Sequence, residues 1–544
     1  MKGLEEMKQT MKRLAASALA AVMTLGLSAT AFAAGNGGDR TLTVTGDTLD
    51  NKNVYAVQMF DARVTGTKDD YTFDSYVLAD EDWLTFFTTE TRSGGVGLTD
   101  QNGDSKVDGE DARLYVESLR GQTLADFAHL AQKWVRSHSS NFAVLTATAS
   151  NDKAIFTELK AGYYLVYPEG GSTGTSNRNT DAMLVNVPRD SDAEWHIKST
   201  FPTVDKKVDT GSGNADNGSA QVGDIVTFTL TSKVPDMTDY ATFYFAFKDT
   251  LSNGLVIVDS NGATVQDGNS ITIDNLTVTI GGKTVATGYT VSLNSNVLKI
   301  EFTDLKTATL AEGSITTDAE IVVTYKAMIT EDAVVGTPAT NTVEVEYSND
   351  PSTSGHGTST PDETDVYTYE IDVNKWATDA GGMTGNLAGA KFVLSTNATL
   401  TNGESDTSVI KLVGSGNNYR VAKPGEGGAV TFFTTTATSD ITISGLGEGT
   451  YYLHEIEAPT GYNQLKAPIQ IVITMTNTPN PGDATITVNG EPATGDDGTV
   501  VDVENKKGIE LPETGSIGTI GLTVAGVAIV LFGIFAPHKK KKAQ

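Results

Sequence analysis

From Thr41 onward, Val, Ile, Thr, Tyr and Phe alternate with polar residues, and turns rich in Gly, Asn and Asp divide the alternation into short segments. A period of two places neighbouring side chains on opposite faces of a strand, so one face can be buried while the other meets water. This pattern is typical of antiparallel β-sandwiches. A chain of 544 residues is too long for one sandwich, and we therefore expect a mainly β fold of tandem Ig-like β-sandwich domains.

One stretch departs from this pattern and has the period of a helix. Between Glu110 and Trp134, apolar residues recur at spacings of three and four, and Gly121 interrupts the series. The sequence therefore predicts a short helical insertion in the N-terminal domain, with two helices divided at Gly121.

An acidic loop stands directly before the predicted helices. Its side chains and carbonyls have the spacing of a twelve-residue calcium loop of the EF-hand or dockerin kind, although Ser105 replaces the usual turn glycine. The candidate ligands are Asp100, Asn102, Asp104, Lys106 through its carbonyl, Asp108 and Asp111. The alternative is an Asx-rich turn that caps the next helix at Asp108 or Asp111. Calcium, in a structural role, is the one cofactor that the sequence indicates.

The N-terminal end of the chain carries a processing signal. A basic pair at residues 12 and 13 precedes the apolar run 14–27, and Ala31-Phe32-Ala33 offers the small residues that a signal peptidase accepts. This predicts a secretory signal peptide over residues 1–33, with Met1, Met7 and Met11 all left open as the start.

The C-terminal end reads Leu511-Pro512-Glu513-Thr514-Gly515, followed by an uncharged apolar run from Ile517 to Ala536 and four lysines at 539–542. A run of about 20 apolar residues crosses the hydrocarbon layer as one helix. The lysines suit a cytoplasmic end. We expect a C-terminal transmembrane helix that holds the precursor transiently in the membrane. An ordinary tail anchor behind a chance pentapeptide is the alternative.

Composition excludes several classes of function. The chain has 39 basic and 68 acidic residues and a net charge of −29, so its surface repels phosphates and no nucleic-acid partner is expected. It has no cysteine, although secreted proteins form disulfides freely, so something else must stabilise it. The six histidines show no spacing of a zinc site or a catalytic triad, and we expect no enzyme acting on an external substrate.

Two lysines take core-facing positions in predicted strands. In the segment VDKKV at 204–208, the period of two puts Lys206 on the apolar face and Lys207 on the other. In IDVNK at 371–375, Lys375 likewise shares the apolar face. A buried ammonium is costly unless it loses its proton or finds a partner. A strand-end lysine whose charged head reaches water is the alternative for either one alone.

Turn-rich composition marks the boundaries between modules, around Pro202 and again at residues 348–364. We divide the chain into a signal peptide (1–33), an N-terminal domain with the helical insertion and the acidic loop (34–200), a middle domain (201–366), a C-terminal domain (367–508), and the LPETG segment with its span and basic tail (511–544).

Several motifs together resemble one known family. The segment Tyr451–Tyr462 fits the phrase Y-x-L-x-E-x-x-A-P-x-G-Y, and Asn505 stands shortly before LPETG. The segments Asp249–Leu255 and Asn341–Pro351 resemble the middle domain of sortase-assembled major pilins. From about residue 200 to the end, the chain thus resembles the fimbrial major subunits of Gram-positive bacteria, which have CnaB-type domains and an LPXTG sorting signal.

The resemblance implies self-made isopeptide bonds between Lys and Asn, assisted by a buried carboxyl group. It assigns Lys206, Asp249 and Asn341 to the middle domain, and Lys375, Glu455 and Asn505 to the C-terminal domain. In the family a protonated acid donates a hydrogen bond to the Asn carbonyl, and the bond ties the first strand to the last. The Tyr-Tyr-Leu phrase of the N-terminal domain lacks the acid, so no such bond is expected there.

The resemblance also implies how the chain is assembled. Sortase would cut between Thr514 and Gly515 and pass the Thr514 carboxyl to a lysine of a neighbouring copy or to peptidoglycan, on the cell wall of a Gram-positive bacterium. By position the acceptor lysine is Lys198, with Lys207 second, because the family's Tyr-Pro-Lys element is absent here. The implied function is a pilus backbone subunit, with host ligands left open. The alternatives are a single-copy wall-anchored adhesin or ancillary pilin and, less favoured, an anchored hydrolase.

Overall fold

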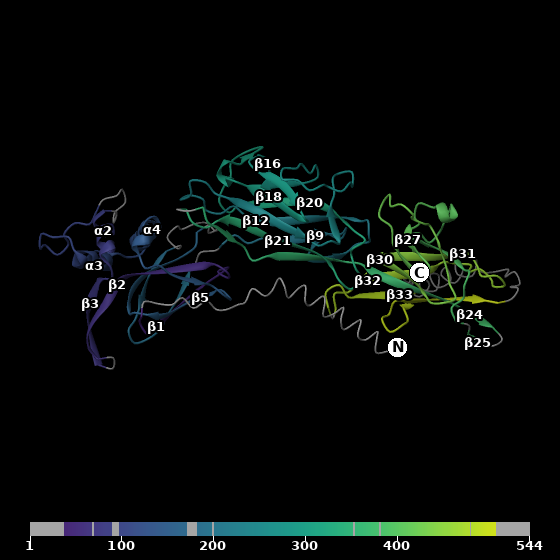
Figure 1. Cartoon of the computed structure of the whole chain (residues 1–544), viewed down its shortest axis with the longest axis horizontal. Coiled ribbons are helices and arrows are strands. Elements are labelled where there is room, and N and C mark those ends of the chain that lie inside the picture. The colour runs from purple at the N-terminus through teal and green to yellow at the C-terminus, as the bar shows by residue number, and fades with distance from the viewer. Residues whose placement is uncertain are drawn as a thin grey trace, which may run out of the picture.

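The computed structural model describes residues 37–67, 70–89, 97–170, 182–197, 201–351, 354–379, 382–383, 385–478 and 480–507. Figure 1 shows three β-rich domains in a row along the long axis, from the purple N-terminal domain to the green and yellow third domain. The prediction of a mainly β fold in tandem domains is therefore confirmed. Within the described ranges no helix is long and apolar enough to cross a membrane, and the predicted span at 517–536 lies outside them.

The N-terminal domain contains two sheets and the helical insertion. The sheets have the strand orders β5-β1-β8 and β3-β2-β6-β7, with β4 also paired to β2. Its elements are β1 (Arg40–Gly46), β2 (Asn53–Thr67), β3 (Asp70–Leu78), α2 (Glu81–Thr89), α3 (Gly109–Ser118), α4 (Gln122–Ser137), β4 (Leu145–Thr148), β5 (Lys153–Leu159), β6 (Gly162–Pro168), β7 (Met183–Val187) and β8 (Ala193–Ile197).

The two predicted helices are confirmed as α3 and α4, and they are separated at Gly121, which has a positive φ of 52°. The sequence did not predict α2. This helix is only nine residues long, and its buried residues Trp83, Phe86 and Phe87 are aromatic, a type that also favours strands. Their spacing of three and four places them on one helix face, where Phe86 and Phe87 pack against Phe127 of α4.

The second domain is a sandwich of two sheets. Their strand orders are β10-β9-β12-β20-β15-β16-β19, with β14 on β20, and β11-β23-β21-β13-β18-β17, with β22 on β21. The strands are β9 (Asp205–Asp209), β10 (Asn214–Ala215), β11 (Asn217–Ser219), β12 (Ile225–Lys233), β13 (Phe245–Leu251), β14 (Leu255–Ile257), β15 (Thr277–Ile280), β16 (Lys283–Thr287), β17 (Thr290–Asn294), β18 (Val297–Phe302), β19 (Thr309–Leu310), β20 (Glu320–Ile329), β21 (Ala339–Ser348), β22 (His356–Thr358) and β23 (Asp362–Tyr367).

The third domain is a second sandwich. One sheet has the order β25-β24-β30-β28-β27 with β35 on β24, and the other has the order β29-β26-β31-β32-β33-β34. The strands are β24 (Tyr369–Asp379), β25 (Gly382–Met383), β26 (Lys391–Ser395), β27 (Leu412–Ser415), β28 (Asn418–Val421), β29 (Phe433–Thr434), β30 (Ile441–Leu446), β31 (Gly449–Glu457), β32 (Ile469–Met475), β33 (Ala484–Val488), β34 (Glu491–Pro492) and β35 (Val500–Lys506).

The stretch at 348–364, interpreted from its composition as a linker, belongs to the second domain. It contains β22 and the beginning of β23, and both strands pair with β21. Gly357 and Thr358 of this stretch lie in β22, and Thr364 lies in β23. Only Thr368, which is buried, separates β23 from β24 of the third domain.

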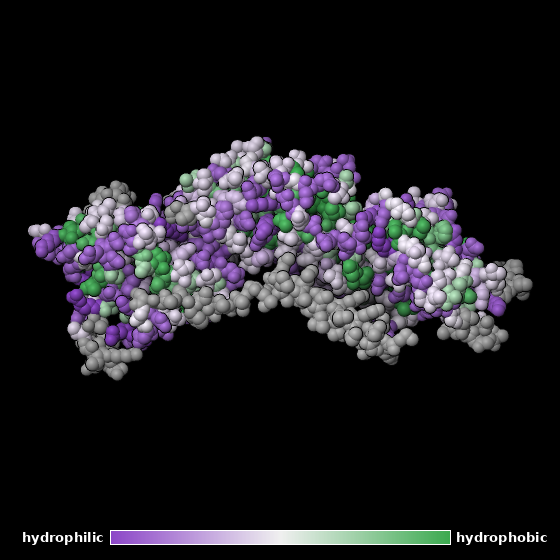
Figure 2. Space-filling model, viewed as in Figure 1, coloured by the Kyte–Doolittle hydropathy of each residue, from purple (hydrophilic) through white to green (hydrophobic). Residues whose placement is uncertain are grey.

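A parallel pair joins an early and a late strand in each domain. β1 pairs with β8, β11 with β23, and β24 with β35. The last of these has seven residue pairs, from Asp372 opposite Val500 to Thr378 opposite Lys506. The face of the molecule in Figure 2 is mostly hydrophilic, with apolar residues in small separate groups, as expected for a solvated acidic protein.

Candidate cross-link sites

A buried pair of lysine and carboxylate lies between the two sheets of the second domain. Lys206 on β9 and Asp249 on β13 are both fully buried, and Lys206 Nζ donates a hydrogen bond to Asp249 Oδ1 at 2.7 Å. The same Nζ lies over the ring of Phe228, 4.9 Å from its centroid. Burial lowers the pKa of Lys206, and the charge of Asp249 opposes this shift. The alternation along β9 correctly placed this side chain in the core.

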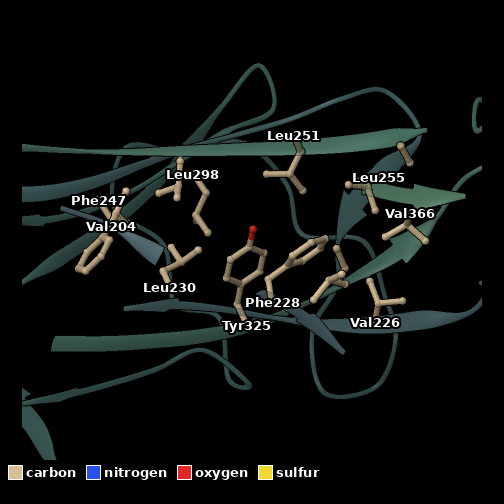
Figure 3. Packing of buried hydrophobic residues seen from close by; sticks show 14 of the residues in the cluster. Val204, Val226, Phe228, Leu230, Phe247, Leu251, Leu255, Leu298, Tyr325 and Val366 are labelled. Atoms are coloured by element: carbon tan, nitrogen blue, oxygen red, sulfur yellow. The ribbon is translucent and has the colours of Figure 1, made fainter. Parts of the chain in front are cut away.

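Tyr325 joins this pair to the asparagine, and the sequence did not single it out. Figure 3 shows Tyr325 rising from one sheet with its hydroxyl directed toward the other. That hydroxyl donates to Asp249 Oδ2 and accepts a hydrogen bond from Asn341 Nδ2 at 2.6 Å. Burial and the charge of Asp249 raise the pKa of Tyr325 well above its usual value, so the phenol keeps its proton. A core-facing tyrosine needs a hydrogen-bond partner for its hydroxyl, and this requirement could have pointed to Tyr325 from the sequence.

The strands that carry this cluster differ from the expectation. Lys206 lies in the sheet of β9, β12 and β20, whereas Asp249 and Asn341 lie in the opposite sheet on the adjacent strands β13 and β21. A bond between Lys206 and Asn341 would therefore join the two sheets. Because β22 and β23 follow β21, Asn341 is not on the last strand of its domain, which corrects the expectation that the first strand is tied to the last.

In the third domain the first and last strands do carry the lysine and the asparagine. β24 and β35 are parallel neighbours, with Ala377 opposite Asn505, so Lys375 lies diagonally across from Asn505. Lys375 is 2% exposed, and its Nζ donates to the carbonyl of Val503 at 3.1 Å. Glu455 reaches the pair from β31 of the opposite sheet, and its Oε2 accepts a hydrogen bond from Asn505 Nδ2 at 2.9 Å.

The buried position of Lys375 changes its ionisation. Burial lowers the pKa of Lys375 to about 8, while the charges of Glu455 and Glu504 oppose the shift. A substantial fraction of this amine is therefore neutral near pH 8, and a neutral amine is a nucleophile.

Both asparagines are held by their nitrogen, and their oxygens lack partners. Asn505 Nδ2 also donates to the carbonyl of Asn463 at 2.7 Å. The buried oxygens Asn341 Oδ1, Asn505 Oδ1 and Glu455 Oε1 have no hydrogen-bond partner. The resemblance implied a hydrogen bond from the acid to the Asn carbonyl, and the structure shows a different contact. The amide nitrogen of the asparagine is contacted by Tyr325 in the second domain and by Glu455 in the third. A buried unsatisfied oxygen costs about 1–3 kcal/mol, so both amides are in strained surroundings.

The acidic loop before α3 is organised by hydrogen bonds to its own backbone. Asp108 is the N-cap of α3, and Asp111 completes a capping box. Asp100 accepts from the backbone N–H of Ser105 at 2.8 Å, and such bonds lower the pKa of Asp100. Ser105 has a positive φ of 70°, at the place of the turn glycine in calcium loops.

These contacts match the Asx-turn alternative directly. Within the described ranges, no three acidic or histidine side chains converge as a metal site requires. Buried Asp111 is already satisfied by the N–H groups of Gln101, Asn102 and Asp108. The placed side chains therefore do not form a ready calcium site, and the calcium ligand set stays a prediction.

The structure describes only one of the two candidate lysines that could accept the Thr514 carboxyl group. Lys198 lies outside the described residues, as does the whole LPETG segment. Lys207 is partly exposed and forms ion pairs with Asp205 at 2.7 Å and Asp216 at 2.6 Å, which raise the pKa of Lys207. As an amine nucleophile Lys207 would first have to give up both partners and its proton.

Comparison with known families adds two matches. Residues 370–487 match the SpaA prealbumin-like fold domain, and residues 503–544 match the LPXTG cell wall anchor motif. The chain is an LPXTG-anchored surface protein. The predicted sorting signal and the attachment to the cell wall are therefore confirmed, and the prealbumin-like domain of the anchored protein contains Lys375 and Glu455.

Individual proteins resemble the anchored protein along most of its length. It is 24% identical over 526 residues, covering 82% of this chain and 91% of its relative, to the trypsin-resistant surface T6 protein of Streptococcus pyogenes serotype M6. Among solved structures, the T6 backbone pilin of that organism has 16% identity and a TM-score of 0.42, covering 87% of this chain and 99% of that one. The Corynebacterium diphtheriae major pilin SpaA has 17% identity and a TM-score of 0.45, covering 86% and 100%.

Proposed function

We propose that the anchored protein is the structural backbone subunit of a covalently polymerised surface pilus, and that isopeptide bonds Lys206–Asn341 and Lys375–Asn505 stabilise it. The observation that carries the proposal is the repeated cluster of a buried lysine, a buried acid and a buried asparagine in two successive domains. The chain has no cysteine, so these clusters are its available source of covalent bonds. A single buried lysine could be an accident of packing, but two with the same partners indicate chemistry.

Each bond forms in the same way. The neutral amine of the lysine attacks Cγ of the asparagine, a C–N bond forms, and the bond from Cγ to Nδ2 breaks. The acid takes the proton from the lysine nitrogen and delivers it to Nδ2, which leaves as ammonia. Glu455 already contacts Nδ2 of Asn505, and Tyr325 connects Asp249 to Nδ2 of Asn341, so the proton path ends on the atom that departs. Burial holds all three groups together and excludes water.

Polymerisation uses the tail of the chain. Sortase cleaves after Thr514 and transfers its carboxyl group to Lys198 of the next copy, or to peptidoglycan at the base of the fibre. Lys198 is preferred to Lys207, because the two ion pairs of Lys207 hold that amine protonated. The second candidate function, a single-copy adhesin or ancillary pilin, shares the anchor but needs no acceptor lysine.

Intact mass of the full-length chain, purified in detergent, tests the cross-links. We expect one ammonia loss from each of these two sites, and Asp249→Ala should remove the first and Glu455→Ala the second. A mass equal to that of the processed sequence would refute the assignment.

Wall extracts test polymerisation, since a backbone subunit gives a ladder of high-mass species that collapses in Lys198→Ala, whereas an adhesin gives one band. A relative is named for trypsin resistance, and we expect slow tryptic cleavage here too, faster in both acid variants.

A further inference from the structure

A third buried lysine lies at the junction of the first and second domains. Lys52, just before β2 of the first domain, is 2% exposed, and its Nζ donates to the carbonyl of Thr358 in the second domain. The Nζ also lies over the ring of Tyr347, 4.9 Å from the centroid, and 5.8 Å from that of Phe201. This amine therefore leaves its own domain and enters an aromatic pocket of the next one.

A buried acid from the first domain accompanies it. Glu169 directly follows β6 and is 5% exposed. Its carboxylate accepts hydrogen bonds from the backbone N–H of Asn53 at 3.1 Å and, at 3.5 Å, from the hydroxyl of Tyr347. The side chain of Asn349, in the second domain, also hydrogen bonds to it. Gly357 permits this approach, since a Cβ there would lie 2.5 Å from Glu169 Oε1.

The junction thus repeats the residue types of the two sites inside the domains, although Asn349, unlike Asn341 and Asn505, is only half-buried. As in the third domain, the lysine nitrogen is held by a strand carbonyl and the acid contacts the asparagine side chain. As in the second domain, a tyrosine hydroxyl contacts the acid and aromatic rings cover the lysine. Burial lowers the pKa of Lys52 and raises that of Glu169, and the charge of each group opposes the shift of the other.

We propose that Lys52 and Asn349 form an isopeptide bond between the first and second domains, with Glu169 as the acid that moves the proton. The amine of Lys52 attacks Cγ of Asn349, the bond from Cγ to Nδ2 breaks, and ammonia leaves with the proton that Glu169 has carried from the lysine nitrogen. The inference rests on the chemistry proposed for the other two sites, but it uses residues of two domains. It would make the junction covalent.

Other contacts hold the two domains in the orientation that the reaction needs. The backbone N–H of Gly170 donates to the carbonyl of Asn349, which places the asparagine beside Glu169. His129 Nε2 of α4 lies 3.2 Å from Asp239 Oδ2 of the second domain. Docking of the two domains therefore places Lys52 and Glu169 against the hairpin of β21 and β22, and Asn349 directly follows β21.

The test uses the full-length chain with Lys206→Met and Lys375→Met, which removes the other two reactions. We expect this double variant still to lose one ammonia, and a peptide map to join the Lys52 peptide to the Asn349 peptide. Adding Glu169→Gln should abolish the loss, whereas adding Lys153→Ala, at an exposed lysine of the same domain, should leave it unchanged. An unmodified mass in the double variant would overturn the proposal.

The outcome separates this inference from the proposed function. Peptide mapping of the unsubstituted chain needs no variant, so it remains decisive even where a substitution disturbs folding. Two ammonia losses with an unlinked Lys52 would refute the junction bond alone. No loss at all would refute the chemistry at all three sites.

Discussion

Replacement of Lys206 by methionine measures how much one cross-link contributes to the stability of the second domain. Methionine fills a similar volume against Phe228, so the loss of stability reports the missing bond together with the lost hydrogen bond to Asp249. The loop between Lys206 and Asn341 spans roughly 135 residues, and closing a loop of that length removes unfolded-state entropy equivalent to about 5 kcal/mol. For a domain of this size, that corresponds to a fall in Tm of about 10–20 °C.

The assay is differential scanning calorimetry combined with intact mass. Lys207→Met is the matched control, because Lys207 is the next residue on the same strand but points outward into two exposed ion pairs. Exposed pairs contribute about 0–1 kcal/mol, so the control should shift Tm by only a few degrees and keep every ammonia loss of the unsubstituted chain. The reasoning is wrong if both variants lower the Tm of the second domain equally, or if Lys206→Met leaves the number of ammonia losses unchanged.

Three further predictions follow from the sites. Tyr325→Phe removes the hydroxyl that connects Asp249 to the amide of Asn341, and the lost hydrogen bond is equivalent to about 2 kcal/mol. The second-domain bond should therefore form about 30-fold more slowly, as measured by a time course of intact mass. An unchanged rate would contradict the proton path. Burial lowers the pKa of Lys375 to about 8, and a protonated Lys375 cannot attack. The rate at which the third-domain bond forms should therefore rise as the pH approaches 8 and then level off. A rate independent of pH from 6 to 9 contradicts this prediction. If the acidic loop binds calcium, titration calorimetry should give heat that Asp100→Ala abolishes, whereas no heat in the unsubstituted chain leaves the loop as a helix cap alone.

Local pattern was enough to predict that Lys206 and Lys375 are buried, but it did not indicate Lys52. The period of two along β9 separates Lys206 from Lys207, and no knowledge of other strands is needed for that distinction. The partners of Lys206 had to be predicted from family motifs instead. Asp249 and Asn341 reach Lys206 through the packing of two sheets, which local alternation does not reveal.

Contacts between sheets and between domains were the part that sequence could not supply. Tyr325 reads as an ordinary core aromatic of β20, since its role depends on which groups the opposite sheet places above its hydroxyl. Glu169 was missed because it follows the Tyr-Tyr-Leu phrase at a different spacing from Glu455, and its contact with Tyr347 comes from another domain. The stretch that contains β22 and the beginning of β23 was interpreted as a turn-rich domain boundary, because its composition does not show that both strands pair with β21.

The parallel pairing of early and late strands determines how each domain would bear tension applied at its two ends. Parallel neighbours begin at the same pole of a domain, so the chain enters at one pole and leaves at the other, and domains can follow one another in series without doubling back. A pull on the two ends loads β24 and β35 in opposite directions along their axes. All seven residue pairs of that ladder then resist together, in shear, whereas an antiparallel hairpin pulled at its open end would yield one pair at a time.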